Sequence, residues 1–288
     1  MKKKLFSKVC IFGVGLLGGS IGMAIKKNGL ADKVVGIGRD IKRLKKAVLL
    51  GAVDTVTTDY ISEVKDADLV ILSMHINSSL EAAKKIAPFL KKDTVVTDVE
   101  STKELFCKKM RGILPDGIHF VGVHPIAGLE RHGVDVATDK LFTETACVIT
   151  RTTKTNKNAF LKVEKLWNEI GANVVLFSPS QHDKLVAFTS HLPHIAAVSL
   201  VNALGKKGTI DKDLKLVIGN GFKDTTRIAS SSPEMWQEIC KTNKKNILDV
   251  LSRFQRELDK VYKLIDKSDS EELIKKLEEA KSLRTSLK

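Results

Sequence analysis

The sequence predicts an α/β protein, with a doubly wound, mostly parallel sheet in an N-terminal domain and an all-α C-terminal domain. In the first half, short apolar runs alternate with amphipathic stretches, which is typical of βαβ units and a parallel sheet. After Ser178-Pro179, β-branched runs become scarce and long helical periodicities take over. At 288 residues, the chain exceeds a typical single domain. We therefore expect two domains, residues 1–178 and residues 179–288.

The strands of the expected sheet are short apolar runs separated by helical patterns. Helical patterns in the first half include Leu16–Lys27, Ser78–Leu90 and a segment around Phe160–Ile170. The last two apolar runs flank this third pattern, and we expect them to complete the sheet. The expected strands are Val9–Phe12, Val34–Ile37, Leu69–Ser73, Val95–Val99, His119–Val123, Ala146–Thr150 and Val174–Phe177.

Two long helical patterns, Met235–Ile265 and Glu271–Leu283, dominate the second half of the chain. Long amphipathic helices on a small domain must bury their apolar stripes, and a symmetric partner subunit is a common solution. We therefore expect residues 179–288 to act as a dimerisation domain and the protein to be a homodimer.

The chain carries a formal net charge of +14, but its charge pattern does not favour nucleic-acid binding. A nucleic-acid binder usually concentrates its basic residues and interleaves aromatic ones, whereas here aromatics make up only 5%. The lysines recur instead on predicted helix surfaces, as at Lys26, Lys27, Lys84 and Lys85. A positive field of this kind would attract a small dianionic substrate and an anionic cofactor.

Neither the N-terminus nor the cysteines indicate secretion or a metal site. The basic start Met1–Phe6 resembles that of a signal peptide, but glycines interrupt the apolar run behind it. No uninterrupted apolar stretch reaches the roughly 20 residues that a membrane span requires, so we expect a cytoplasmic protein without membrane contact. The four cysteines are far apart and form no C-x-x-C pair, so we expect reduced thiols and no bound metal.

A glycine-rich turn directly after the first expected strand indicates a dinucleotide site. Its glycines are Gly13, Gly15 and Gly18, in a G-x-G-x-x-G that lies between a strand and a helix. The first allows the turn, the second lets the backbone approach a pyrophosphate, and the third lets helix and strand pack closely. Backbone N–H groups at Leu16 and Leu17 would add the attraction of a helix N-terminus for negative charge. We therefore expect a Rossmann-like domain that binds NAD or NADP.

The end of the second expected strand bears on the choice between these cofactors. An acidic residue there would bind the ribose 2′-hydroxyl of NAD, but Gly38 occupies the position and Arg39 follows. A guanidinium pairs well with a 2′-phosphate. Asp40 favours NAD only if it turns toward the ribose, and it could equally be a helix N-cap. The pattern favours NADP and leaves NAD as an alternative. Ser73, at the carboxyl end of its expected strand, is a further candidate for cofactor binding.

Candidate catalytic groups follow two neighbouring strands, where ligands of open α/β sheets bind. Ser101 follows one, and His124 follows the next, beside a proline and glycines. A histidine there suits general-base work because its pKa is near neutral. In the helical half, His191 and His194 are three residues apart and share a helix face, and Pro193 predicts a local irregularity. These three histidines could ligate a metal, but no H-E-x-x-H pattern accompanies them.

Five motifs together resemble the prephenate and arogenate dehydrogenase (TyrA) family, and they occur in family order over nearly the whole chain. Any one of them alone is weakly specific, since short motifs arise by chance. The motifs are Gly13–Ser20, His124-Pro125-Ile126-Ala127-Gly128, Ser190-His191-Leu192-Pro193-His194, Gly221–Arg227 and Ser232-Pro233-Glu234-Met235-Trp236.

The resemblance implies roles for individual residues. His124 would take the proton of the ring hydroxyl, and Ser101 would orient that histidine and the substrate. Arg227 would bind a substrate carboxylate, while His191, His194 and Ser190 would line the pocket. Glu130 would help gate the pocket, with Lys223 and Asp224 near it. The sequence departs from the family pattern at Glu100, where a small residue is more usual, and at Leu129 and His132.

The activity implied by the resemblance is NAD(P)-dependent oxidative decarboxylation of prephenate to 4-hydroxyphenylpyruvate, in tyrosine biosynthesis. Arogenate is an alternative substrate that the motifs do not separate from prephenate. Another two-domain hydroxyacid dehydrogenase is a further alternative, although such enzymes usually use a lysine that has no comparable motif here. A redox-sensing or DNA-binding protein that only holds a dinucleotide would have no use for His124, His194 and Arg227.

Overall fold

The computed structural model describes residues 4–128, 131–205 and 209–287. Its N-terminal part is one eight-stranded sheet in the order β3-β2-β1-β4-β5-β6-β7-β8. All neighbouring strands pair in parallel except β6 and β7, which are antiparallel. The strands are β1 (Phe6–Phe12), β2 (Ala31–Ile37), β3 (Thr55–Thr57), β4 (Leu69–Leu72), β5 (Val95–Asp98), β6 (His119–Pro125), β7 (Ala146–Thr150) and β8 (Asn173–Phe177).

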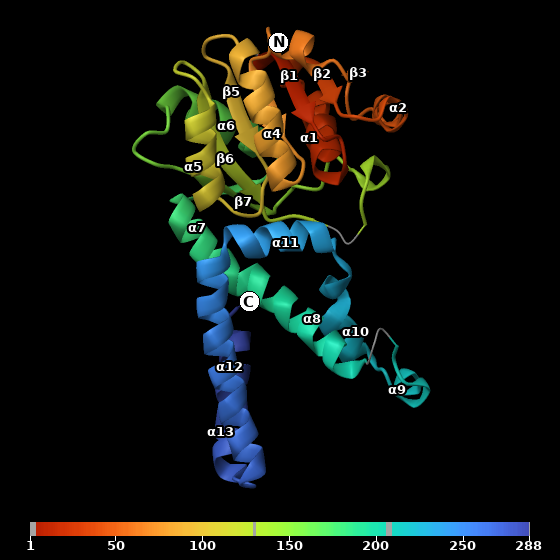
Figure 1. Cartoon of the computed structure of the whole chain (residues 1–288), viewed down its shortest axis with the longest axis vertical. Coiled ribbons are helices and arrows are strands. Elements are labelled where there is room, and N and C mark those ends of the chain that lie inside the picture. Colours follow the sequence, from red (N-terminus) through yellow and green to blue (C-terminus); the bar gives the residue numbers. More distant parts are fainter. Residues whose placement is uncertain (1–3, 129–130, 206–208, 288) are drawn as a thin grey trace.

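Helices cover both faces of this sheet, so the predicted doubly wound, mostly parallel architecture is confirmed (Figure 1). One core lies beneath α1 (Leu16–Lys27), α2 (Ile41–Leu49) and α6 (Lys157–Glu169). The other lies beneath α3 (Tyr60–Val64), α4 (Ile76–Ile86) and α5 (Glu104–Ile113). Because most of the strands are largely buried on both faces, they read as continuous apolar runs in the sequence. The two edge strands differ: β8 is apolar but partly exposed, and the three residues of β3 are too few to show a pattern.

From Pro179 onward the described chain is helical, as the sequence predicts. Residues 1–178 and 179–288 as separate domains stay a prediction, although β8 ends at Phe177 and α7 begins at Pro179. The helices are α7 (Pro179–Val186), a π-helical turn (Ala187–His191), α8 (Leu192–Leu204), α9 (Lys212–Leu216), α10 (Asn220–Thr226), a 3-10 turn (Arg227–Ser230), α11 (Pro233–Thr242), α12 (Lys244–Asp266) and α13 (Ser270–Thr285).

Two local features of the helical part have identifiable causes. Pro193 lacks a backbone N–H and lies in the first turn of α8, directly after the π-helical turn, so the predicted irregularity is present. The expected single helix Met235–Ile265 is wrong, because the chain breaks at Asn243 between α11 and α12. The Asn243 amide donates to the Asp183 carbonyl at 2.7 Å, a tertiary bond that periodicity does not reveal.

Helix α11 lies across the boundary between the sheet and the other helices, and α12 and α13 extend away from it (Figure 1). Two polar contacts join α11 to the sheet domain. Thr242 Oγ1 lies 2.9 Å from Thr102 Oγ1, and the Asn77 amide donates to Glu238 Oε1 at 2.6 Å. The carboxyl ends of β4 and β5 therefore face a helix of the second half.

The run Pro179–Leu204 is long and apolar enough to cross a membrane by length and composition alone. Only 28% of the most apolar 18-residue stretch of this run is buried. The same run carries the buried polar residues His182, Asp183, His191 and His194. Buried polar groups need partners, and these ones turn toward the polar site described next.

Candidate active site

The glycine-rich turn has the geometry that the sequence predicts for a dinucleotide site. Gly13 has φ +84°, a region that L side chains rarely adopt, and a Cβ there would lie 2.3 Å from the Ser73 carbonyl oxygen. A Cβ on Gly18 would lie 2.2 Å from the Gly13 oxygen, so β1 and α1 could not pack as they do. Both positions therefore require glycine.

Open space lies where the pyrophosphate is expected. Gly15 is the N-cap of α1, and a Cβ built on it would meet nothing within 4 Å. Among the described residues, no side chain caps this helix or occupies the N–H groups of its first turn, which includes Leu16 and Leu17. A helix N-terminus that is uncapped and unobstructed fits a dinucleotide pyrophosphate. Ser73 lies at the next strand end, where its N–H donates to the Phe12 carbonyl at 2.8 Å.

At the end of β2, Asp40 is an N-cap, one of the two alternatives that the sequence leaves open. Its Oδ1 accepts the backbone N–H groups of Lys42 at 3.0 Å and Arg43 at 3.3 Å. Arg39 is exposed. The Asp40 carboxylate is therefore engaged with α2, and the cationic side chain beside it is accessible.

His124 is the penultimate residue of strand β6, and its Nδ1 is 2.8 Å from His182 Nε2. His182 Nδ1 is in turn 2.8 Å from Asp183 Oδ1. The Asp183 carboxylate also accepts two backbone N–H groups at the start of α5, from Lys103 at 2.7 Å and Glu104 at 2.9 Å. These bonds join β6, α7 and α5 in one chain of polar contacts.

His182 and Asp183 were not among the residues predicted from the sequence. A His-Asp pair in the first helix after the sheet, next to the predicted histidine motif, was the available signal. By contrast, no hydrogen bond joins Ser101 to His124 in the described part of the chain, and Ser101 is half-buried after β5. The orienting role of Ser101 stays a prediction, while the nitrogen of His124 that it would have to hold is already engaged by His182.

Burial keeps these imidazoles neutral. It holds the pKa of His124 well below the usual 6.5, and interactions with the neighbouring His182 ring and the Lys103 ammonium add to the effect. Burial also lowers the pKa of His182, although the bond to Asp183 opposes the shift, and it lowers the pKa of His191 to about 4. A neutral imidazole has one nitrogen with a free lone pair, which is what a general base requires.

Beneath His124 lies a fully buried polar cluster at the end of β5. Lys103 Nζ donates to Asp98 Oδ2, and neither side chain has any exposed surface. Asp98 Oδ1 accepts the Val123 N–H at 3.0 Å, one residue before His124. Ser79 Oγ donates to Glu100 Oε1 at 2.6 Å. Burial, and then the Asp98 charge, raise the pKa of Glu100 to about 8.

The π-helical turn and α8 bring two more predicted histidines together on Trp236 of α11. The His194 ring is stacked on the indole, and the His191 ring meets it edge-on with centroids 5.8 Å apart. The Asn243 amide lies 3.2 Å from His191 Nδ1. Burial lowers the pKa of His194, and a hydrogen bond with the Ile228 backbone, next to Arg227, opposes the shift.

Two donors in this cluster, His191 Nε2 and Trp236 Nε1, are buried and have no hydrogen-bond partner among the residues that the structure describes. Buried polar atoms are nearly always paired, so each unpaired one needs an explanation. His124 Nε2 differs: it makes no hydrogen bond with the described residues, yet it is not closed off from solvent.

The remaining predicted residues lie at the edges of this region. Arg227, Lys223 and Ser190 are exposed, on the 3-10 turn, α10 and the π-helical turn respectively. Glu130 lies outside the described residues. Within the described ranges, no group of three histidine, cysteine or acidic side chains has an arrangement that could hold a metal ion.

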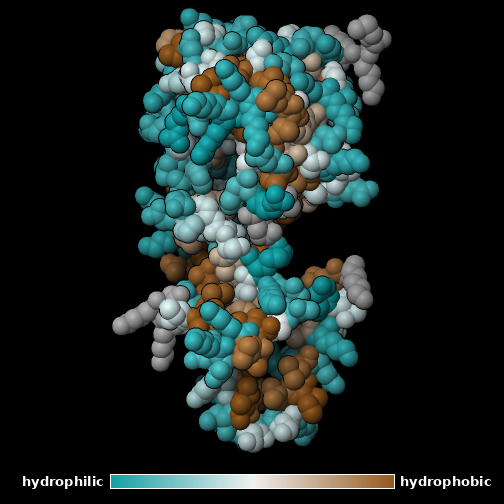
Figure 2. Space-filling view, turned by 90° about the vertical axis from the view of Figure 1, so that its right-hand side faces the viewer, coloured by the Kyte–Doolittle hydropathy of each residue, from teal (hydrophilic) through white to brown (hydrophobic). Residues whose placement is uncertain are grey.

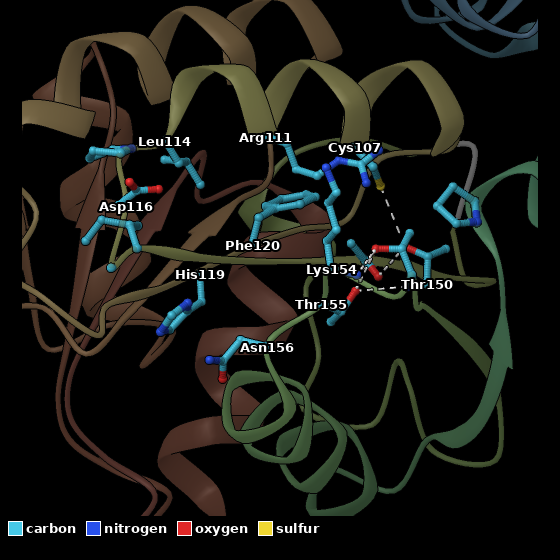
Figure 3. Close-up of a pocket in the computed structure, with 16 residues that line it drawn as sticks. Cys107, Arg111, Leu114, Asp116, His119, Phe120, Thr150, Lys154, Thr155 and Asn156 are labelled. Carbon is cyan, nitrogen blue, oxygen red and sulfur yellow. Dashed lines mark hydrogen bonds between the residues drawn. The ribbon is translucent and has the colours of Figure 1, made fainter.

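A polar cavity of about 250 Å³ lies elsewhere, between the end of α5 and the loop before α6 (Figure 3). Arg111, His119, Lys154 and Asn156 line it. None of the predicted site residues that the structure describes is among its lining residues. The candidate site is therefore the region around His124, Trp236 and the glycine-rich turn.

Two family models match successive parts of the chain. Residues 21–176 match the family "Prephenate dehydrogenase, nucleotide-binding domain", and residues 178–279 match "Prephenate dehydrogenase, dimerization domain". The prephenate dehydrogenase of Bacillus subtilis (strain 168) is 35% identical over 97% of this chain and 76% of its own length. The cyclohexadienyl dehydrogenase of Zymomonas mobilis is 32% identical over 99% of this chain and 97% of its own length.

A solved structure of Aquifex aeolicus prephenate dehydrogenase, in complex with hydroxyphenyl propionate and NAD+, is similar over its whole length. It has a TM-score of 0.91 and 37% identity, and the match covers 98% of each chain. Most of the sheet-containing first half and most of the helical second half of the present chain thus match a nucleotide-binding and a dimerisation domain. The chain belongs to the prephenate dehydrogenase family of NAD-dependent dehydrogenases.

Proposed function

We propose that this protein catalyses the NAD(P)-dependent oxidative decarboxylation of prephenate to 4-hydroxyphenylpyruvate. The observation that carries the proposal is His124, a neutral imidazole at the carboxyl end of β6. Its Nδ1 is engaged by His182, while no residue that the structure describes engages its Nε2. The reaction removes a proton from a ring hydroxyl, a hydride from the ring carbon that bears this hydroxyl, and CO2 from the opposite ring carbon. Aromatisation drives it, so the protein mainly has to orient the substrate and take up the proton.

In this mechanism His124 Nε2 takes the hydroxyl proton, and His182 holds the imidazole in place through Nδ1. The nicotinamide, when bound, accepts the hydride. Gly13, Gly15 and the first turn of α1 would hold the pyrophosphate of the cofactor, and Ser73 would lie beside it. General-base assistance is typically worth about 10²–10⁴-fold in rate.

The donors near Trp236 support prephenate over arogenate. His191 Nδ1 accepts from Asn243, so the neutral ring carries its proton on the unpaired Nε2. Trp236 Nε1 is also a donor only, and Arg227 carries a guanidinium. Such groups suit the keto oxygen and carboxylates of prephenate. The ammonium of arogenate would meet donors where it needs acceptors.

A four-way assay tests the substrate and the cofactor together: prephenate or arogenate, each with NAD or NADP, followed by the absorbance of the reduced cofactor. We expect prephenate to have the higher kcat/KM, and equal or better turnover of arogenate would reject the substrate assignment. His124→Asn should retain cofactor affinity and lose turnover by about 10²–10⁴-fold. Unchanged turnover would remove His124 from the mechanism.

For the cofactor, we infer a preference for NADP with NAD still accepted. Exposed Arg39 can pair with a 2′-phosphate, and the Asp40 carboxylate that would repel it caps α2 instead. Arg39→Ala should raise the KM for NADP roughly 10-fold or more and leave the KM for NAD within about twofold, since charged hydrogen bonds contribute about 1.5–3 kcal/mol. Equal effects on both cofactors would contradict this preference.

We also infer a cytoplasmic homodimer formed through the helical part. Hydrophobic side chains gather on the lower, helical half of the molecule (Figure 2). Exposed ones include Leu200 on α8, Leu248 and Ile265 on α12, and Leu277 on α13. Apolar side chains exposed together on one part of a protein mark interaction sites. Sedimentation analysis should give twice the 31.7 kDa chain mass, and a monomer at micromolar concentration would contradict the dimer.

A further inference from the structure

We propose that His182 and Asp183 are positioning residues that fix which nitrogen of His124 carries the proton. The inference rests on the proposed function, because it concerns the base of that reaction. Neither residue has to touch the substrate. Their effect passes through the two hydrogen bonds that connect Asp183 to His182 and His182 to His124.

The direction of this chain of hydrogen bonds is set at Asp183. Its Oδ1 accepts the Lys103 N–H and its Oδ2 accepts the Glu104 N–H. These groups belong to the first residues of α5, whose dipole stabilises a negative charge at that end. An ionised carboxylate can only accept hydrogen bonds. His182 Nδ1, 2.8 Å from Oδ1, must therefore be the donor.

The remaining proton positions follow from neutrality. A neutral imidazole has one N–H and one lone pair, so His182 Nε2 is an acceptor. His124 Nδ1, 2.8 Å away, must then be the donor, and the lone pair of His124 lies on Nε2. This is the nitrogen that no described residue engages. The opposite tautomer would set a lone pair of His182 against the carboxylate inside the protein.

Other ionisable groups face these hydrogen bonds, and none of them reverses the donor and acceptor roles along the Asp183–His182–His124 series. Lys103 and Asp98 approach from the end of β5 as a closed ion pair, and His191 approaches from the π-helical turn in the neutral form. When His124 takes up the substrate proton, it becomes positively charged and its Nδ1–H···His182 hydrogen bond becomes stronger. Asp183 stabilises this charge through its own hydrogen bond to His182, and neither histidine loses a proton to its neighbour.

Asp183→Asn is the direct test, because it keeps the shape and can reverse the direction. The new amide can donate to His182 Nδ1, which would move the His182 proton to Nε2 and the His124 proton to its own Nε2. We expect kcat to fall on the order of 10²–10⁴-fold, as loss of the correct tautomer does in a serine protease triad. The affinity for the cofactor, measured by fluorescence titration, should stay within about threefold.

A spectroscopic readout separates this role from a structural one. With ¹⁵N-histidine labelling, the His124 signals, assigned by their loss in His124→Asn, should show an unprotonated Nε2 in the wild type. In Asp183→Asn they should show a protonated Nε2. A protonated Nε2 in the wild type, or kcat within about threefold in the variant, would overturn the proposal. Absence of any dehydrogenase activity in the wild type would count against the proposed function instead, and the tautomer could still be read.

A pair of variants at His182 keeps the test decisive if Asp183→Asn does not fold. The glutamine amide of His182→Gln can donate to Asp183 and accept from His124, so it should retain at least a tenth of the activity. His182→Leu can do neither, and it should lose activity by 10²-fold or more. Equal activity of the two would overturn the proposal. His119→Gln, at the far end of β6, is the matched control and should be unaffected.

Discussion

His194 lies flat against the indole of Trp236, with ring centroids 3.5 Å apart and ring planes 4° from parallel. The two residues come from α8 and α11, so the stack joins two helices of the second half. The unpaired Nε1 of the same indole lies in a site where two other histidines line up along α7 and the π-helical turn. Trp236 therefore serves both packing and, in the proposed function, recognition.

Trp236→Phe separates these two roles, because phenylalanine retains an aromatic ring and lacks the N–H donor. If the indole N–H binds the substrate, the KM for prephenate should rise roughly 2- to 10-fold, the value of one neutral hydrogen bond. The melting temperature should fall by a few degrees at most, since the smaller ring loses some packing and the lost donor has no partner among the described residues. An unchanged KM for prephenate would contradict a role of the indole N–H in binding.

The buried pair of Lys103 and Asp98 should be the charged contact on which stability depends most. Lys103→Met removes the cation and leaves Asp98 buried without its partner, a change that typically costs about 3–5 kcal/mol. Urea unfolding followed by circular dichroism measures the loss. Lys84→Met, which breaks an exposed pair with Glu81, is the control and should cost no more than about 1 kcal/mol. Equal losses in both variants would contradict the importance of burial here.

The sequence predicts those features of the fold and the site whose causes lie within a few neighbouring residues. The apolar strands and the turn at Gly13 were predicted because their causes lie within a few residues. The break at Asn243 was not, since apolar periodicity continues across it from Ile239 to Ile247 and the cause is a tertiary bond to Asp183. His182 was missed for the same reason, because it meets His124 only after α7 packs against α5, β7 and β8.

Glu100 should make the stability of the protein depend on pH. Its pKa is raised from 4.5 to about 8, by burial and then by Asp98, with Lys103 and the Ser79 hydroxyl opposing and Glu238 of α11 adding to the shift. A carboxyl group whose folded pKa is raised binds more protons in the folded state. Its contribution is thus fully present below about pH 4.5 and is lost as the pH rises toward about 8.

Glu100→Gln removes this titration while keeping an acceptor for Ser79. We expect the variant to be close to the wild type in free energy of unfolding at pH 5, and more stable at pH 9 by on the order of 2–4 kcal/mol. Chemical denaturation at the two pH values measures the difference. A constant difference between the proteins across this range would show that Glu100 does not titrate there.

The pH dependence of catalysis should reflect the lowered pKa of His124. The base must be unprotonated to act, and burial together with the neighbouring His182 and Lys103 holds its pKa well below 6.5. The acid limb of the profile of kcat/KM against pH, which reports the free enzyme, should therefore fall below pH 6.5. Lys103→Met, measured where it remains folded, removes a positive charge that disfavours the imidazolium, so its acid limb should move to higher pH. An acid limb at or above pH 6.5 in the wild type, or no movement in the variant, would mean that another group controls the limb.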